Sequence, residues 1–195
     1  MAKNKMAKDG NSIVKAVRKK ASNYFLVREY KKVKRKPQAL NLSQARNIGI
    51  LFEVRGKEDV DTVRAFVAQI KERNRKITAL GYVTTKELLQ TLKSDNEFDF
   101  ISKEDFNWYY KPEKYVIKNF MSDGMDVLID LSLKKNPALL YTAAFTEAKM
   151  KVARFDEKQK EYYDLMIDIG KDNTLNYLIN QIKFYITKIN EQSTQ

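Results

Sequence analysis

The stretch Met125-Asp126-Val127-Leu128-Ile129-Asp130-Leu131 has the clearest strand pattern in the chain, a short apolar run that reaches a carboxylate near its end. An apolar run of this length is typical of a strand buried on both faces of a parallel sheet. Asn136 and Pro137 follow and predict the start of a helix rich in Ala and Leu, because proline is tolerated in the first turn of a helix. The stretch therefore predicts one strand–helix unit of an α/β sheet.

The same alternation continues in both directions from this unit. Strands joined by helices predict a parallel sheet with right-handed crossovers. We therefore expect a Rossmann-like, doubly wound α/β fold with a mainly parallel sheet and helices on both faces. The strands are expected at Ile48–Val54, Lys76–Val83, Phe98–Ile101, Met125–Leu131, Lys151–Arg154 and Tyr163–Ile169. The helices are expected at Glu58–Asn74, Lys86–Lys93, Glu113–Met121, from Asn136 onward, and at Thr174–Glu191.

Charge divides the chain into two parts. Its 195 residues carry a formal net charge of +12, from 37 Lys and Arg against 25 Asp and Glu. Residues 1–46 contain 14 of these bases and only two acids, Asp9 and Glu29, so residues 47–195 hold 23 of each and are neutral overall. We expect a basic helical N-terminal extension over residues 1–46 and an α/β sandwich domain over residues 47–195. Such a charge difference indicates contact with nucleic acid or an anionic membrane.

The basic extension has the pattern of a helix. Asn11-Ser12 is a suitable N-cap, and no Gly or Pro occurs between Ser12 and Lys36, after which Pro37 ends the pattern. This pattern predicts a helix of about two dozen residues, about 36 Å long at a rise of 1.5 Å per residue. Its apolar stripe consists of Ile13, Val17, Ala21, Tyr24 and Phe25.

Ten bases of the extension are the candidate nucleic-acid contacts, because Lys and Arg neutralise phosphates and release bound counterions. Several of them form the cluster Lys31–Lys36, whose five bases in six residues are more than a helix C-terminus needs. The candidates are Lys15, Arg18, Lys19, Lys20, Arg28, Lys31, Lys32, Lys34, Arg35 and Lys36.

Two carboxylates of the body end apolar runs, near the sheet edge where parallel sheets bind ligands. Asp130 and Asp168 could bind a metal or act as acid and base. A strand-end aspartate more often accepts hydrogen bonds from the amides of the next loop, and we favour that interpretation. Lys134 and Lys135 could hold a phosphate, although a lysine pair before a helix is more often solvated surface. No G-x-G-x-x-G or G-x-x-x-x-G-K-[ST] motif follows the first strand, so no dinucleotide or P-loop site is expected.

The run Phe106-Asn107-Trp108-Tyr109-Tyr110 is the densest aromatic cluster and contains the single tryptophan. Aromatic rings beside bases can stack on nucleobases or anchor a partner. The alternative is a hydrophobic plug that covers the sheet edge or the N-terminal helix, and we favour this second interpretation. Trp108 therefore stays a candidate contact only.

Missing residue types exclude several chemistries. The chain has no Cys and no His, which rules out disulfides, cysteine nucleophiles, Ser-His-Asp triads and His-ligated metals. No run approaches the 18 apolar residues of a membrane span, and the charged start Met1–Lys5 lacks the apolar core of a secretory signal. We expect a cytoplasmic protein without a small-molecule cofactor.

The chain also shows two resemblances to known families. Ile48–Val54, Asp126–Ser132 and Tyr163–Ile169 together resemble an uncharacterised bacterial family described only as a domain of unknown function. That resemblance covers most of the chain and implies no activity.

More distantly, the chain resembles the N-terminal lobe of heptosyltransferase-type glycosyltransferases. That family has a Gly-Asp-Val after its first strand and a later strand that reads roughly Val-Ile-Asp-Leu. Val127–Leu131 is similar to the later strand, while Asp59-Val60 lies near the former position with Glu58 in place of the glycine. The resemblance implies a catalytic carboxylate near Asp59. The second lobe, which holds the sugar nucleotide, has no counterpart here, and this weakens the interpretation as an enzyme.

These observations favour a non-catalytic RNA-binding protein that is ribosome-associated and anchored by its basic N-terminal helix. Its expected partners are ribosomal RNA and ribosomal proteins. One alternative is a peripheral membrane protein or protein-interaction module whose extension lies on anionic lipid. Another is a small-ligand-binding or degenerate glycosyltransferase-like domain that uses Asp59, Asp130 and Asp168.

Overall fold

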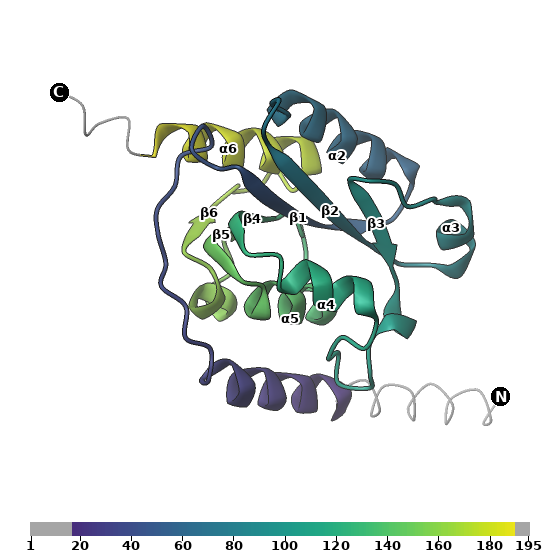
Figure 1. Cartoon of the computed structure of the whole chain (residues 1–195). Helices are drawn as coiled ribbons and strands as arrows, with labels where there is room; N and C mark the ends of the chain where they lie inside the picture. Colours follow the sequence, from purple (N-terminus) through teal and green to yellow (C-terminus); the bar gives the residue numbers. More distant parts are fainter. Residues whose placement is uncertain (1–16, 190–195) are drawn as a thin grey trace.

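The structure, a computed structural model, describes residues 17–189 and contains one six-stranded sheet (Figure 1). The strand order is β3-β2-β1-β4-β5-β6, and every pair of neighbours is parallel. The strands are β1 (Asn47–Val54), β2 (Lys76–Val83), β3 (Phe98–Ile101), β4 (Met125–Asp130), β5 (Ala148–Arg154) and β6 (Leu165–Ile167). The helices are α2 (Lys57–Ile70), α3 (Lys86–Thr91), α4 (Tyr115–Met121), α5 (Pro137–Phe145) and α6 (Leu175–Lys188). This confirms the predicted Rossmann-like α/β fold.

The centre of the sheet is the pair β1 and β4, where the strand order reverses. Ile48 pairs with Val127 on one side and with Ile77 of β2 on the other. Side chains alternate between the two faces of β1, so Ile50 and Leu51 are both buried but belong to different clusters. A strand buried on both faces explains why the predicted apolar runs are nearly continuous.

Helices cover both faces of the sheet. On one face, α2 and α6 pack their apolar sides on the strands, for example through Phe66 and Ile182. On the other face, α4 and α5 cover the sheet with Ile117 and Leu139. Figure 1 shows these two layers above and below the sheet. Among the described residues, no helix has the length and hydropathy needed to cross a membrane.

Two glycines of the central strands allow close packing. A Cβ added at Gly49 would lie 2.1 Å from the sulfur of Met125. A Cβ at Gly81 would lie 2.9 Å from atoms of both Phe52 and Val54. Larger side chains at these positions would therefore force neighbouring core residues to move.

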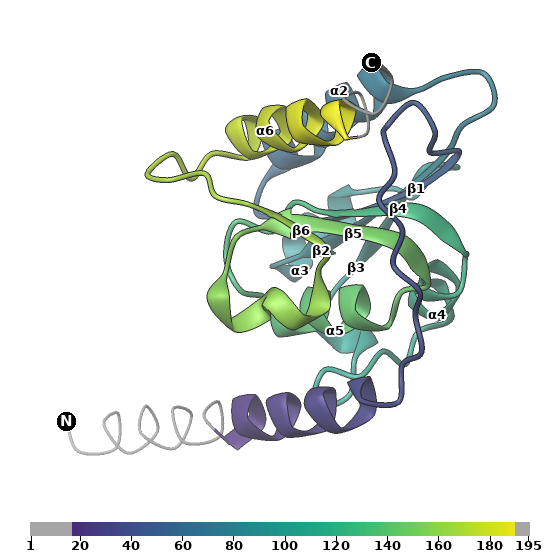
Figure 2. The same cartoon turned by 90° about the vertical axis from the view of Figure 1, so that its left-hand side faces the viewer.

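The described part of the N-terminal helix covers residues 17–30 and forms an additional layer beyond α4 and α5 (Figures 1 and 2). The predicted N-cap Asn11-Ser12 lies outside the described residues. The predicted extension of this helix to Lys36 is wrong, because the backbone leaves the helix after residue 30. The amide of Val33 still donates to the carbonyl of Tyr30 at 2.9 Å, as the last tight turn.

Residues 33–46, which we call the strap, connect this helix to β1 and pass from one face of the sheet to the other. The amide of Gln38 donates to the carbonyl of Lys149 at 2.9 Å. Leu40 is buried in the core on the α2 and α6 face. The Asn41 amide donates to the carbonyls of Thr187 and Ile189 at the end of α6. These contacts favour an extended chain over a longer helix.

Some boundaries differ from the sequence prediction. The last strand spans only Leu165–Ile167 rather than Tyr163–Ile169, and an unpredicted 3-10 segment, Glu157–Tyr162, precedes it. β5 starts three residues earlier than expected, at Ala148. α2 ends at Ile70 rather than Asn74.

Candidate nucleic-acid interface

The N-terminal helix is held on the body by a small buried contact. Leu26 is 3% exposed and belongs to the same cluster as Leu139 and Leu140 of α5. The hydroxyl of Tyr141 donates to the carboxylate of Glu29. Burial and this carboxylate both raise the pKa of Tyr141, so the tyrosine stays a donor. The helix thus has an apolar and a polar attachment to α5.

The apolar stripe predicted for this helix differs from its buried face. Val17 and Tyr24 are 55% and 60% exposed, while Ser22 and Leu26 are buried. The helix turns Leu26 toward α5, which leaves Val17 and Tyr24 toward solvent, whereas Ala21 and Phe25 are partly buried. Ile13 of the predicted stripe lies outside the described residues.

The aromatic loop packs against the other flank of the helix, as the sequence interpretation favoured. The rings of Phe25 and Tyr109 lie 4.5 Å apart, and the guanidinium of Arg18 lies 4.0 Å above the ring of Tyr110. Tyr110 has a φ of 69°, an uncommon backbone conformation for a bulky residue. Asn107 stabilises this turn, because its side-chain oxygen accepts from the amides of Tyr109 and Lys111.

The charged side chains of the strap alternate between the body and solvent. Arg35 points inward and forms a two-bond ion pair with Asp164. The same guanidinium donates to the carbonyls of Ala148 and Lys149, each at 3.1 Å. Lys34 and Lys36, one residue to either side, are exposed, as the alternation of an extended chain requires. Arg35 therefore has an internal partner, whereas its neighbours face solvent.

Apart from Arg18, which is partly buried against Tyr110, the remaining candidate bases in the described part of the chain are exposed. Within residues 17–189, none of them forms an ion pair with an acid, whereas Lys71, Lys76 and Lys149 of the body do. Lys15 lies outside the described residues. The exposed candidates are Lys19, Lys20, Arg28, Lys31, Lys32, Lys34 and Lys36.

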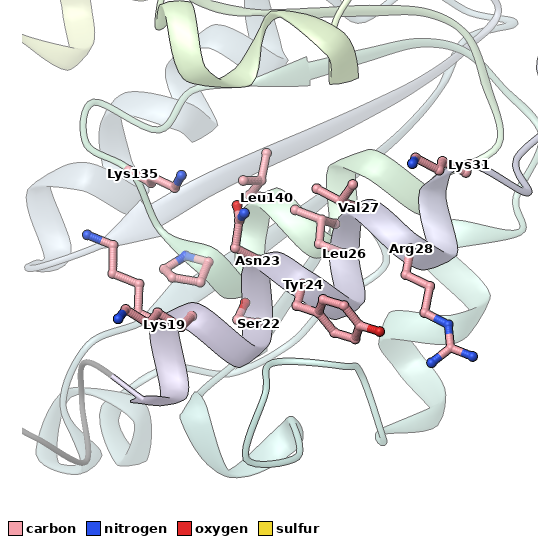
Figure 3. Close-up of a pocket in the computed structure, with 12 residues that line it drawn as sticks. Lys19, Ser22, Asn23, Tyr24, Leu26, Val27, Arg28, Lys31, Lys135 and Leu140 are labelled. Carbon is pink, nitrogen blue, oxygen red and sulfur yellow. The ribbon is translucent and has the colours of Figure 1, made fainter.

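An open groove of about 810 Å³ runs between this helix and the start of α5 (Figure 3). Its apolar lining comes from both elements, with Leu26 on the helix and Pro137 and Leu140 on α5. Figure 3 shows Lys19 on the helix side and Lys135 on the α5 side. Every charged residue that lines it is a base: Lys19, Lys20, Arg28, Lys31 and Lys135.

Each of the three candidate carboxylates of the body accepts a hydrogen bond from a backbone amide within four residues, and Asp130 also accepts one from the distant Tyr163. Asp130 is 3% exposed, accepts from the hydroxyl of Tyr163 at 2.5 Å and from the amide of Ser132 at 2.9 Å, and burial raises its pKa. Asp168 accepts from the amide of Gly170 at 2.8 Å. Asp59 binds the backbone amide and guanidinium of Arg55. These contacts agree with the structural interpretation of Asp130 and Asp168.

Of these body candidates, the structure brings only Asp130 and Lys134 to one cavity. That cavity, of about 10 Å³, has room for roughly one water molecule and is also lined by Arg154 and Tyr163. Asp59 and Asp168 do not line it. Among the described residues, no group of three or more acids is placed to hold a metal ion.

Several residues that shape this region are not among those predicted from the sequence. Tyr141 and Tyr163 are 112 and 33 residues away from the carboxylates that they bind. No local spacing connects such distant pairs. The helical pattern assigns Tyr24 to the apolar stripe. Its spacing of four residues from both Lys20 and Arg28 is the sequence signal that places it among the basic residues instead.

The fold and this region define a Rossmann-like α/β protein that carries an additional helix with exposed bases. The chain belongs to a family of unknown function, DUF6913, whose family model matches residues 18–189. No curated protein and no solved structure matches the chain. The family match confirms the predicted resemblance to an uncharacterised family and covers the N-terminal helix as well as the sheet.

Proposed function

We propose that this protein binds RNA through the outer face of its N-terminal helix and strap, and that ribosomal RNA is its target. The observation that supports this most is the set of seven exposed bases without acidic partners in the described part of the chain. Bases already paired with carboxylates would gain less from a phosphate, because the existing ion pair must first break. These seven are available for phosphate contacts.

The attachment of the helix also favours RNA over a membrane surface. The most buried apolar side chain of the helix, Leu26, already packs on α5. The exposed apolar residues left on the described helix are Val17 and Tyr24. Membrane binding by an amphipathic helix scales with the apolar area it inserts, and this area is small here. Phosphate binding requires the Lys and Arg side chains and no inserted apolar area.

Co-sedimentation with ribosomes of the native host tests this function. A variant in which Lys20, Arg28 and Lys31 are all replaced by Gln is expected to pellet much less at moderate salt, because three phosphate contacts are lost. Wild-type protein should pellet at low salt and be released steeply as salt rises.

The matched control replaces three bases elsewhere. Lys57, Lys93 and Lys171 are exposed, lie in the body, and have no ion pair within residues 17–189. Their replacement by Gln changes the net charge equally and is expected to leave co-sedimentation within about twofold of wild type, since such surface changes leave the fold intact. If both variants lost co-sedimentation equally, net charge alone would explain the loss, and the proposal would be overturned. So would absence of wild-type protein from the pellet at low salt.

A further inference from the structure

Four aromatic side chains form a continuous strip from the N-terminal helix to the aromatic loop. The ring centroids of Tyr24 and Phe25 are 5.5 Å apart, those of Phe25 and Tyr109 are 4.5 Å apart, and those of Tyr109 and Trp108 are 5.5 Å apart. The two ends of this aromatic strip are exposed, Tyr24 by 60% and Trp108 by 57%. Of these four rings, the inner pair, Phe25 and Tyr109, joins the helix to the loop.

Bases flank the exposed end of the strip on the helix. Lys20 and Arg28 lie four residues before and after Tyr24, so all three side chains share one face of the helix. Four residues correspond to a rise of about 6 Å. The ring of Tyr24 therefore has a cation about one turn away on each side. Lys31 extends the same face by three more residues.

Exposed aromatic rings that lie between Lys and Arg side chains are suited to bind unpaired nucleotides. Single-stranded nucleic acids are bound by aromatic side chains that stack on the bases and by a positively charged surface that follows the backbone. In a duplex the bases are stacked on each other, and an A-form helix offers the protein mainly phosphates and 2′-hydroxyls. The paired nucleobases of a duplex could not stack on Tyr24 and Trp108, so duplex binding would leave these two exposed rings without a contact.

We propose that the RNA bound by this protein is single-stranded where it contacts the helix, and that its bases stack on Tyr24 and Trp108 while Lys20 and Arg28 hold the adjoining phosphates. This inference rests on the proposed RNA-binding function and names the class of RNA. The basic groove beside Tyr24 offers further room for the same strand, because Tyr24 also lines it.

Fluorescence of Trp108, the only tryptophan of the chain, provides a direct test. The full-length protein is titrated with a 12-nucleotide oligouridine and, separately, with a 12-base-pair RNA duplex of mixed sequence. Stacking on Trp108 is expected to give a saturable quench with oligouridine and little change with the duplex. Tyr24→Ala is expected to weaken oligouridine binding about 10-fold and to leave duplex binding within about twofold.

Two further variants control for packing and for ring chemistry. Tyr24→Phe keeps the ring and is expected to bind oligouridine nearly as wild type does. Tyr115→Ala removes a 76% exposed aromatic side chain at the start of α4, outside the strip, and is expected to have no effect.

The outcomes separate this inference from the function on which it rests. If duplex and oligouridine bind equally well, without a quench and without an effect of Tyr24→Ala, the stacking inference is overturned while RNA binding stands. If neither RNA binds at low salt, the proposed function itself fails. A quench that Tyr24→Ala weakens and Tyr24→Phe restores supports the inference.

Discussion

Replacement of Lys151 by methionine is expected to stabilise the protein at pH 7 by about 2–4 kcal/mol, since a buried amine is costly to charge. Lys151 is fully buried between β5 and α5, and burial lowers the pKa of its side chain from 10.5 to about 7. Its Nζ donates to the carbonyl of Ala144 at 2.7 Å, and loss of this bond offsets the gain by about 1 kcal/mol.

The pH dependence has a defined sign. The folded-state pKa of Lys151, about 7, lies below the ordinary value of 10.5, so the unfolded chain binds more protons between these two pH values. Stability therefore rises with pH through this window and is lost as the pH falls toward 7. Relative to Lys151→Met, the free energy of unfolding of wild type is expected to rise by up to about 1.4 kcal/mol per pH unit between pH 7 and 9.5.

Urea unfolding of both proteins at several pH values in this range measures the effect. Lys149→Met is the matched control, because Lys149 lies two residues away in β5, is exposed, and pairs with Asp126 at 2.7 Å. This exposed ion pair contributes no more than about 1 kcal/mol. Parallel pH profiles of wild type and Lys151→Met would contradict a lowered pKa at Lys151.

The second large effect is expected at Leu26, whose replacement by alanine should detach the N-terminal helix. Truncation of a buried leucine costs about 2–5 kcal/mol. Between residues 17 and 30, Leu26 is the buried apolar side chain, and the apolar contacts that remain after the change include those of the partly buried Phe25 and Tyr30. RNA affinity is expected to fall several-fold although the net charge is unchanged, because the bases are no longer held in one arrangement.

Hydrogen exchange of the amides in residues 17–30 reports the detachment, and oligouridine affinity at fixed salt reports its consequence. Val17→Ala is the control on the same helix, since Val17 is 55% exposed and surface changes usually cost under about 0.5 kcal/mol. Fast exchange together with wild-type RNA affinity would show that a docked helix is not required.

Much of the fold could be predicted because its information is local. The strands Lys76–Val83 and Phe98–Ile101 have the predicted bounds, since their apolar runs are short and bounded by polar residues. The strap could not be predicted in this way. Its extended form depends on Arg35, whose partner Asp164 is 129 residues away. A helix that continued as far as Lys36, directly before Pro37, agreed with the local pattern.

The candidate site was predictable in its charge and not in its geometry. The excess of Lys and Arg in the extension is apparent from the sequence. That Arg35 points inward while Lys34 faces solvent depends on long-range packing. Lys151 shows the same limit. The alternation of β5 turns it toward α5, but only the assembled layers bury it.

The most direct measurement of the central claim is the salt dependence of oligouridine binding by the full chain. Each phosphate contact to a single strand contributes a slope of about −0.7 in log K against log salt. The variant with Lys20, Arg28 and Lys31 replaced by Gln is therefore expected to have a slope shallower by about 2 than wild type. The variant at Lys57, Lys93 and Lys171 is expected to keep the wild-type slope. Equal slopes for wild type and the helix variant would contradict RNA binding by this face.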